Sequence, residues 1–349
     1  MEVKRVFPDD RWQECYECYL QSVLSRSGST ASLKTYSDEL RTFFADSEKA
    51  KDPTSYTRSD VIRRMQAPSQ SRRSPGSPPT GATQNHRLSL LRSWFTWCST
   101  WIAPGEPEPL FNRALPTNGI RRLREAVVYK ALSHDELRSF FAAIDEHAFE
   151  PATAARNRAL FTTALLTALR RSELLNITFA AITPATFTEH GQIRQGFVLK
   201  YFGKGKSRQQ STRELPPAAM AAIAAYVDIS GRKPTPQEFV FQSVRPGTGI
   251  RDGSEADQNR PLSGGYCNHI CKDIAKIANI AHWQDVSMHS FRHSSAHERL
   301  AAGQSIQEIS KALGHSDISV TARYLQFLSG EEDSGALALE ARMPWLTRL

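Results

Sequence analysis

The chain has 349 residues, 40% of them hydrophobic and 23% charged, which is the composition of an ordinary globular protein long enough for two domains. It lacks an apolar run of about 18 residues, and "MEVKRVFPDD" lacks a signal-peptide core, so we expect no membrane contact and a cytoplasmic, nucleoid-associated protein. Lys and Arg (44) outnumber Asp and Glu (36), and this net charge of +8 favours an anionic partner such as nucleic acid.

Four helices are predicted within the first 105 residues. Three lie within residues 10–66, where apolar side chains recur at helical spacing in "WQECYECYLQSVL" and "SLKTYSDELRTFFADS", and where "TRSDVIRRMQ" begins behind a Thr or Ser cap. A Pro, Gly and Ser-rich loop at 67–82 precedes the fourth helix, "TQNHRLSLLRSWFTWCSTWI". This loop and helix carry the arginines that we expect to contact DNA: Arg72, Arg73, Arg87 and Arg92. For the two on the helix, a solvated helix face is the alternative.

A second proline-rich segment separates two domains. It contains the basic run "RRLR", in which Arg121 and Arg122 are further candidates for DNA contact, and a basic linker suits two domains that close around a polyanion. The predicted organisation is a helical domain at 1–105, a basic Pro-rich linker at 106–127, a second domain at 128–327 and a tail at 328–349.

The second domain mixes helices with a few strands. It opens with a capping box in "SHDELRSFFAAI", followed by an apolar helix that breaks near Arg170. "GQIRQGFVLKYF" and "SRQQSTRELP" predict two strands joined by the turn "GKGK", and "EFVF" predicts a short strand. A long polar loop covers 244–263. Further helices are predicted at 218–229 and at about 264–279, 289–302, 305–313 and 316–327.

A metal site is the weaker interpretation of two clusters. We favour buried free thiols over a zinc site built from Cys15, Cys18, Cys267 and Cys271. Three histidines spaced by four residues could line one helix face, but no Glu lies between them as in H-E-x-x-H, and an intervening arginine would repel a cation: His289, His293 and His297. We therefore predict no metal and no cofactor.

The remaining chemistry is cationic or phenolic. Its residues stand in four short stretches, "TALRRSELL", "FGKGKS", "MHSFRHSS" and "LGHSDISVTARYL": Arg170, Lys204, His289, Arg292, His315 and Tyr324. Guanidinium groups match phosphate oxygens and can stabilise the added negative charge of a pentacoordinate phosphorus. A tyrosine hydroxyl can attack that phosphorus, and a lysine or histidine can protonate the leaving oxygen. Together these residues indicate phosphodiester chemistry that needs neither metal nor ATP.

The four stretches, in this order, resemble the boxes of the tyrosine recombinase (phage integrase) family, including its Xer-like and integrase-like members, over about residues 128–325. The resemblance implies that Tyr324 is the nucleophile, that Arg170 and Arg292 hold the non-bridging oxygens, and that Lys204, or less favourably Lys206, protonates the leaving 5′-oxygen. By the same resemblance, His289 assists proton transfer, His315 bonds the phosphate and Glu173 is a buried support. Ala168 stands where the family often has Gly, and we expect no loss because Ala is compatible with a helix.

The resemblance also implies the fold and the partners. We expect a mainly α protein with a small antiparallel β-sheet, built as a helical core-binding (SAM-like) domain and a catalytic domain that clamp double-stranded DNA in a C shape. A homo-tetramer on two DNA sites would exchange strands through a Holliday junction, in integration or excision of a mobile element or in dimer resolution, with a partner recombinase or directionality factor left open. The tail, with "ALALEARMPWL", would pack on a neighbouring subunit or in cis. The alternatives are a type IB topoisomerase-like nicking-closing enzyme and a non-catalytic DNA-binding relative.

Overall fold

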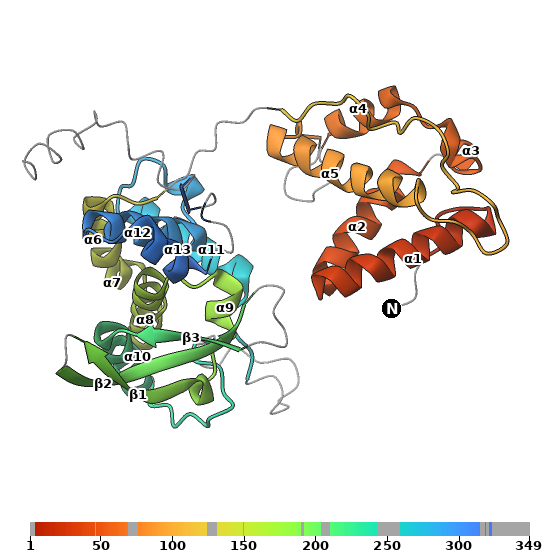
Figure 1. Cartoon of the computed structure of the whole chain (residues 1–349). Coiled ribbons are helices and arrows are strands. Elements are labelled where there is room, and N and C mark those ends of the chain that lie inside the picture. The colour runs from red at the N-terminus through yellow and green to blue at the C-terminus, as the bar shows by residue number, and fades with distance from the viewer. Residues whose placement is uncertain are drawn as a thin grey trace, which may run out of the picture. The chain divides into compact units, whose positions relative to one another are not determined.

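The chain divides into two compact units, Met1–Val127 and Val128–Leu349, and each is described by itself. The computed structural model (Figure 1) describes residues 4–45, 47–68, 76–123, 131–148, 150–189, 192–203, 210–242, 259–314, 318 and 321–322. Within these ranges, none of the helices combines the length and the apolar character needed to cross a bilayer.

The first unit is helical and has an aromatic core. Its helices are α1 (Asp10–Ser27), α2 (Thr30–Phe43), α3 (Ser47–Ala50), η1 (Pro53–Ser55), α4 (Arg58–Gln66) and α5 (Gly81–Cys98). Trp94 of α5 is fully buried, and its ring stacks on Phe7 with centroids 5.8 Å apart while Tyr19 of α1 meets it edge-on at 5.3 Å. Burying such large rings contributes much of the apolar stabilisation of a small unit.

The segment predicted as a linker begins as part of this unit. Phe111 and Ile120 are 1% and 7% exposed and lie in its core. Asn85 of α5 holds the backbone of Leu123 at both its groups, donating to the carbonyl at 3.0 Å and accepting from the N–H at 2.8 Å. The prolines of this segment thus shape a loop that packs on the helices.

The second unit combines helices with one small sheet. Its helices are α6 (His134–Ala142), α7 (Ile144–His147), α8 (Pro151–Thr167), α9 (Arg171–Leu175), η2 (Phe179–Ala181), α10 (Pro217–Ile229), α11 (Gly264–Ile277), η4 (Trp283–Asp285), α12 (Met288–Ala301) and α13 (Ile306–Leu313). The strands β1 (Ile182–Glu189), β2 (Gln192–Phe202) and β3 (Gln210–Leu215) pair in the order β1-β2-β3, antiparallel throughout (Figure 1). The predicted fold class, mainly α with a small antiparallel sheet, is confirmed.

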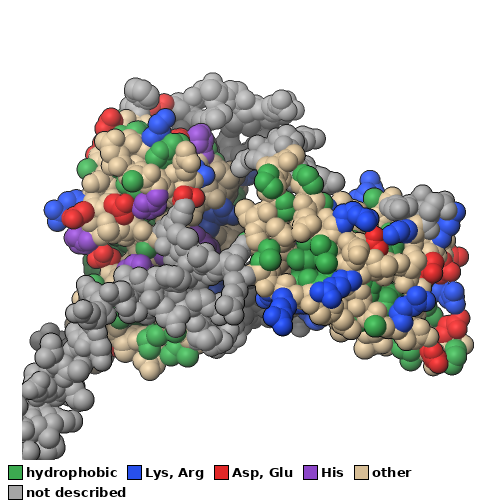
Figure 2. Space-filling view, turned by 90° about the horizontal axis from the view of Figure 1, so that it is seen from above, with side chains coloured by type: hydrophobic (Ala, Val, Ile, Leu, Met, Phe, Trp, Pro, Cys, Tyr) green, Lys and Arg blue, Asp and Glu red, His purple; other side chains and the backbone are tan. Residues whose placement is uncertain are grey.

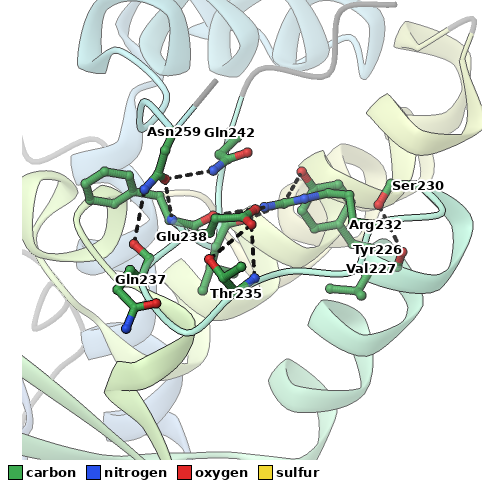
Figure 3. A network of polar contacts seen from close by, with 11 residues as sticks. Tyr226, Val227, Ser230, Arg232, Thr235, Gln237, Glu238, Gln242 and Asn259 are labelled. Atoms are coloured by element: carbon green, nitrogen blue, oxygen red, sulfur yellow. Dashed lines mark hydrogen bonds and ion pairs between the residues drawn. The ribbon is translucent and has the colours of Figure 1, made fainter. Parts of the chain in front are cut away.

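Two details of the sheet differ from the prediction. Strand β1 was not predicted, because Pro184 interrupts its pattern; β1 is an outer strand, where a proline is tolerated. The strand predicted at "EFVF" is wrong: Phe239 forms only an isolated bridge with Thr178. Arg232 fixes this segment instead, donating to Glu238 at 3.0 Å and to the Tyr226 hydroxyl at 3.1 Å (Figure 3).

Helix α8 runs through the core of the second unit. Its Phe161 ring stacks with Phe291 of α12 at 5.0 Å, and Phe140 of α6 meets both rings edge-on. All three side chains are fully buried. Because dense packing fixes the helix, its C-terminal end is a rigid point from which the chain turns toward Arg170.

Candidate active site

The candidate site begins where α8 ends. Ala168 caps the helix in the left-handed conformation (φ 52°), its N–H bonded to the Ala164 carbonyl at 3.0 Å. We expected Ala168 to be harmless because alanine suits a helix, but the residue is not helical. In the left-handed conformation an L-residue costs roughly 1–2 kcal/mol. The methyl group is fully buried in a small cluster with Ala296, Ile309 and Leu313.

Arg170 follows this turn and starts α9. Its backbone N–H donates to Glu173 Oε2 at 2.8 Å, and its Nη1 donates to Glu173 Oε1 at 2.9 Å. The Glu173 side chain is 4% exposed, whereas that of Arg170 is 29% exposed. Glu173 is thus a buried support, as the resemblance implied, and it orients a guanidinium group that solvent and ligands can still reach.

Arg292 reaches the same turn from α12. Its side chain is buried, and its guanidinium donates to the Ala168 carbonyl at 2.5 Å and to the Leu313 carbonyl at the end of α13. One arginine therefore joins the ends of two helices, α8 and α13. Because Ala168 is two residues before Arg170, the structure brings together these two arginines of the predicted site.

His289 lies one turn before Arg292 on α12 and has an exposed edge. Partial burial lowers its pKa below the usual 6.5, and the positive charges of Arg292, Arg171 and Arg170 lower that pKa further. The imidazole is therefore neutral at pH 7, so it can accept one proton and donate another.

Sequence reasoning missed two arginines at this helix end. Three consecutive carbonyls accept guanidinium donors: Leu166 from Arg299 at 2.9 Å, Thr167 from Arg213 and Ala168 from Arg292. The last carbonyls of a helix need partners, and cations there also oppose the helix dipole. The sequence shows that a helix ends here and that its last carbonyls need donors. No spacing rule, however, links a strand residue at 213 to a helix end at 167.

Several predicted site residues lie outside the described residues. They are Lys204, Lys206, His315, Tyr324, Arg72 and Arg73. Their described neighbours are ordered elements: Phe202 pairs with Gln210 at the end of the β2–β3 ladder, and Gly314 caps α13 in the left-handed conformation. Their roles stay predictions.

Four of the arginines that we expected to contact DNA are described, and their environments differ. Arg87 is 7% exposed, and its Nη1 donates to the carbonyls of Arg64, Met65 and Ala67 at 3.1, 3.1 and 2.6 Å, so it caps α4 and is not available to DNA in this arrangement. Arg92 donates to the Ile120 carbonyl, Arg122 donates to Ser89 Oγ at 2.6 Å, and Arg121 is exposed. Figure 2 shows Lys and Arg side chains spread over the visible face of this unit.

The two clusters considered for metal binding have other surroundings. Within the described ranges, no three His, Cys, Asp or Glu side chains are arranged to share a metal ion. The cysteines are free thiols, and Cys15 Sγ lies 3.8 Å from Cys98 Sγ between α1 and α5. His289 and His293 lie ring to ring, edge-on, at 6.1 Å.

Comparison with known proteins assigns this chain to a family. The model of the phage integrase family matches residues 130–329. The tyrosine recombinase XerC of Mesorhizobium japonicum is 29% identical over 198 residues, 56% of this chain and 54% of that protein, so the chain spans about half the length of this relative. A tyrosine recombinase of Thermosipho africanus is 24% identical over 331 residues, 93% of this chain and 97% of that protein.

Solved structures agree on the fold. The XerH site-specific recombinase, in its post-cleavage complex with palindromic difH substrate, has a TM-score of 0.64 at 17% identity and covers 99% of this chain and 91% of that chain. The lambda integrase tetramer bound to a Holliday junction has a TM-score of 0.62 at 15% identity, with 92% and 79% covered.

Because the family model spans more than half of its residues, the chain belongs to the phage integrase family of tyrosine recombinases. The predicted family, and with it the predicted class of a tyrosine recombinase family enzyme, is thereby confirmed.

Proposed function

We propose that this chain is a site-specific recombinase that cleaves and rejoins double-stranded DNA through a 3′-phosphotyrosyl intermediate. The observation that carries the proposal is the joint placement of Arg170 and Arg292 around the turn at Ala168, with His289 one turn before Arg292 on α12. The family match continues past this turn to residue 329 and so includes Tyr324.

The two arginines would bind the scissile phosphate. Arg170, oriented by Glu173, presents a partly exposed guanidinium, while the buried Arg292 adds positive charge from behind the turn. Guanidinium groups held in place before the substrate arrives stabilise the extra negative charge of the pentacoordinate phosphorus without reorganising during the reaction. This arrangement supports catalysis in which protein cations supply the positive charge.

The covalent step exchanges one phosphate ester for another. The Tyr324 oxygen attacks phosphorus, the bond from phosphorus to the 5′-oxygen breaks, and the tyrosine proton leaves to a base, for which the neutral His289 is suited. Lys204 donates a proton to the departing 5′-oxygen, and His315 bonds a non-bridging oxygen. The ester conserves the bond energy, so the reverse attack by a 5′-hydroxyl rejoins DNA without ATP.

The assembly and cellular role follow from the same chemistry. We infer a homo-tetramer on two DNA sites that exchanges strands through a Holliday junction, with the core-binding domain at 1–105, the linker at 106–127, the catalytic domain at 128–327 and the tail at 328–349. Lambda integrase was solved as a tetramer on such a junction, which supports this assembly for a relative of the same fold. In the cell we place the protein in the cytoplasm, on the nucleoid.

Covalent trapping tests the proposal. The protein is incubated with nicked duplexes that cover the flanks of its own gene, because a nick beside the cleaved phosphate releases the short 5′-hydroxyl strand and prevents rejoining. We expect a slow-migrating protein–DNA band on denaturing gels. Tyr324→Phe should lose this band and keep DNA affinity, because only the hydroxyl is removed, while Tyr266→Phe, at an exposed tyrosine of α11, should keep both.

The outcomes separate the alternatives. A band that persists in Tyr324→Phe would show that another residue is the nucleophile. Salt-sensitive DNA binding without any band would indicate a non-catalytic relative. Relaxation of plasmids regardless of sequence, with no exchanged product, would indicate the topoisomerase-like activity.

A further inference from the structure

Arg213, on strand β3, joins the sheet to the end of α8. One Nη donates to the Thr167 carbonyl, and the other donates to the Tyr201 hydroxyl of β2 at 3.0 Å. Its guanidinium carbon also lies 5.5 Å from the centre of the Tyr201 ring, within range of a cation–π contact. The side chain is half-buried, so these contacts are only partly screened by water.

The carbonyl that Arg213 holds is next to the one that Arg292 holds. The Thr167 and Ala168 carbonyls are consecutive, and between them the chain enters its left-handed turn. Arg213 also reaches the second attachment of Arg292: a Cβ on Gly314 would lie 3.9 Å from its Nη2, and the preceding Leu313 carbonyl accepts from Arg292. Arg292 therefore bonds to both chain segments, while Arg213 bonds to the first and lies beside the second.

The contacts of these two arginines matter because the turn at Ala168 is not intrinsically stable. Ala168 occupies a backbone region that L-residues avoid, so its surroundings must hold it there. Without Arg213, the Thr167 carbonyl loses a charged donor and its peptide can rotate. That rotation displaces the Ala168 carbonyl, and with it Arg292 and the start of α9, where Arg170 stands.

We propose that Arg213 is a positioning residue for DNA cleavage: it fixes the Thr167–Ala168 turn so that Arg170 and Arg292 are held for the scissile phosphate. This inference rests on the proposed recombinase function. Misplacing a phosphate-binding group by about 1 Å can slow a reaction on the order of 100-fold, so the effect of losing Arg213 is measurable although it contacts no DNA.

The test compares cleavage of two DNA fragments, one with a charged and one with a neutral phosphorus group at the cleaved position. The DNA fragment on which the wild type is trapped is prepared with an ordinary phosphodiester or with a methylphosphonate at the cleaved position. The methylphosphonate lacks one negative charge and so depends less on guanidinium groups. We expect Arg213→Ala to slow covalent-complex formation about 10- to 100-fold on the phosphodiester and within about threefold on the methylphosphonate. Arg213→Lys, which keeps one charged donor, should recover part of the loss.

Arg299→Ala is the matched control. Arg299 holds the Leu166 carbonyl at the same helix end, one residue farther from the turn, so its loss should lower the unfolding temperature about as much as Arg213→Ala while leaving the cleavage rate nearly unchanged. Unfolding temperature and DNA affinity are measured for every variant, so that loss of folding is separated from loss of chemistry.

Three results would overturn the inference: an equal loss of rate on both targets, no loss on the phosphodiester, or an equal loss in Arg299→Ala. A wild-type protein that forms no covalent complex on any fragment would instead refute the proposed recombinase function, and with it the basis of this inference.

Discussion

Both units of the protein bury an arginine against the C-terminal end of a helix, but the charges around the two arginines differ. Arg87 in the first unit donates to three carbonyls at the end of α4, and Arg292 in the second unit donates to the ends of α8 and α13. In both places a guanidinium donates to carbonyls at the end of a helix, where its charge interacts favourably with the helix dipole.

The difference lies in the charges nearby. Beside Arg87, Arg64 forms a two-pronged ion pair with Glu39, both bonds 2.7 Å long. In the second unit, partial burial is the main cause that lowers the pKa of His289, and the charges of Arg292, Arg171 and Arg170 lower this pKa further. Burial and carbonyl contacts alone therefore do not mark an arginine as functional. An accumulation of positive charge that an incoming phosphate can neutralise is the better indicator.

The largest expected effect tests the second unit. Arg292→Ala removes a guanidinium next to the proposed phosphate position, and we expect covalent-complex formation to slow at least about 10²- to 10³-fold, the loss typical of one oxyanion-stabilising donor. Single-turnover trapping measures the rate, and thermal unfolding shows whether the variant is folded. A folded variant with nearly wild-type cleavage would contradict the assignment of this residue.

The matching substitution in the first unit is Arg87→Ala. It removes a charged donor that three carbonyls share, so we expect the free energy of unfolding to fall by about 1–3 kcal/mol. Folded Arg87→Ala should cleave its target at the wild-type rate. Chemical denaturation and trapping of the same sample measure both. A cleavage defect without loss of stability would mean that Arg87 contacts DNA after all, as the sequence suggested.

The dependence of stability on pH sharpens the comparison further. The pKa of His289 is lower in the folded protein than the usual 6.5, so the unfolded chain binds its proton more readily. The contribution of His289 to stability is therefore complete above pH 6.5 and is lost as the pH falls through the folded pKa. We expect His289→Gln to lose less stability than the wild type between pH 7 and about pH 5, measured by thermal melts.

A second histidine, His147, does not disturb this comparison. Its pKa is also lowered, mainly by burial, so its protonation destabilises the wild type and His289→Gln equally at low pH. The contribution of His147 therefore cancels when the two pH profiles are subtracted. Identical pH profiles of the wild type and His289→Gln would show that folding does not lower the pKa of His289.

The smallest effect concerns the turn itself. Ala168→Gly relieves about 1–2 kcal/mol of left-handed strain but loses a buried methyl worth about 0.8 kcal/mol and adds backbone freedom in the unfolded chain. We expect a net change within about 1 kcal/mol. Ala296→Gly, in the same cluster but inside α12, gains no such relief and should cost about 1.5–2 kcal/mol. Equal losses in the two variants would show that the turn stores no strain.

The sequence predicts the parts of this molecule that depend on local periodicity. Helices α1, α8 and α12 carry apolar side chains at helical spacing, and "HSFRHS" places His289 and Arg292 one turn apart on a helix. Pairwise spacing within one element also predicts the Ser133–Glu136 capping box at the start of α6. These are interactions between residues three or four apart, where chain geometry alone fixes the distance.

Interactions between distant segments were not predictable in this way. The exposed or buried state of Arg87 depends on where α4 ends, and the contact of Arg213 with Thr167 depends on how β3 packs against α8. Ala168 reads as a helical residue, and only the fold shows that it is left-handed. Strand β1 was missed for the same reason. Its proline is tolerated because β1 is an outer strand, and that position is a property of the assembled sheet.

The bonds that hold the end of α8 also set an order of events during protein synthesis. The contacts of Arg213, Arg292 and Arg299 with this helix end close loops of 46, 124 and 133 residues. Contacts over such separations form late, because the entropy of closing a long loop must be offset before they stabilise anything. A ribosome-bound chain that has reached only α10 has its first arginine box but not the second. Under the proposed function it therefore lacks the paired phosphate-binding groups, so a partly synthesised chain cannot cleave DNA.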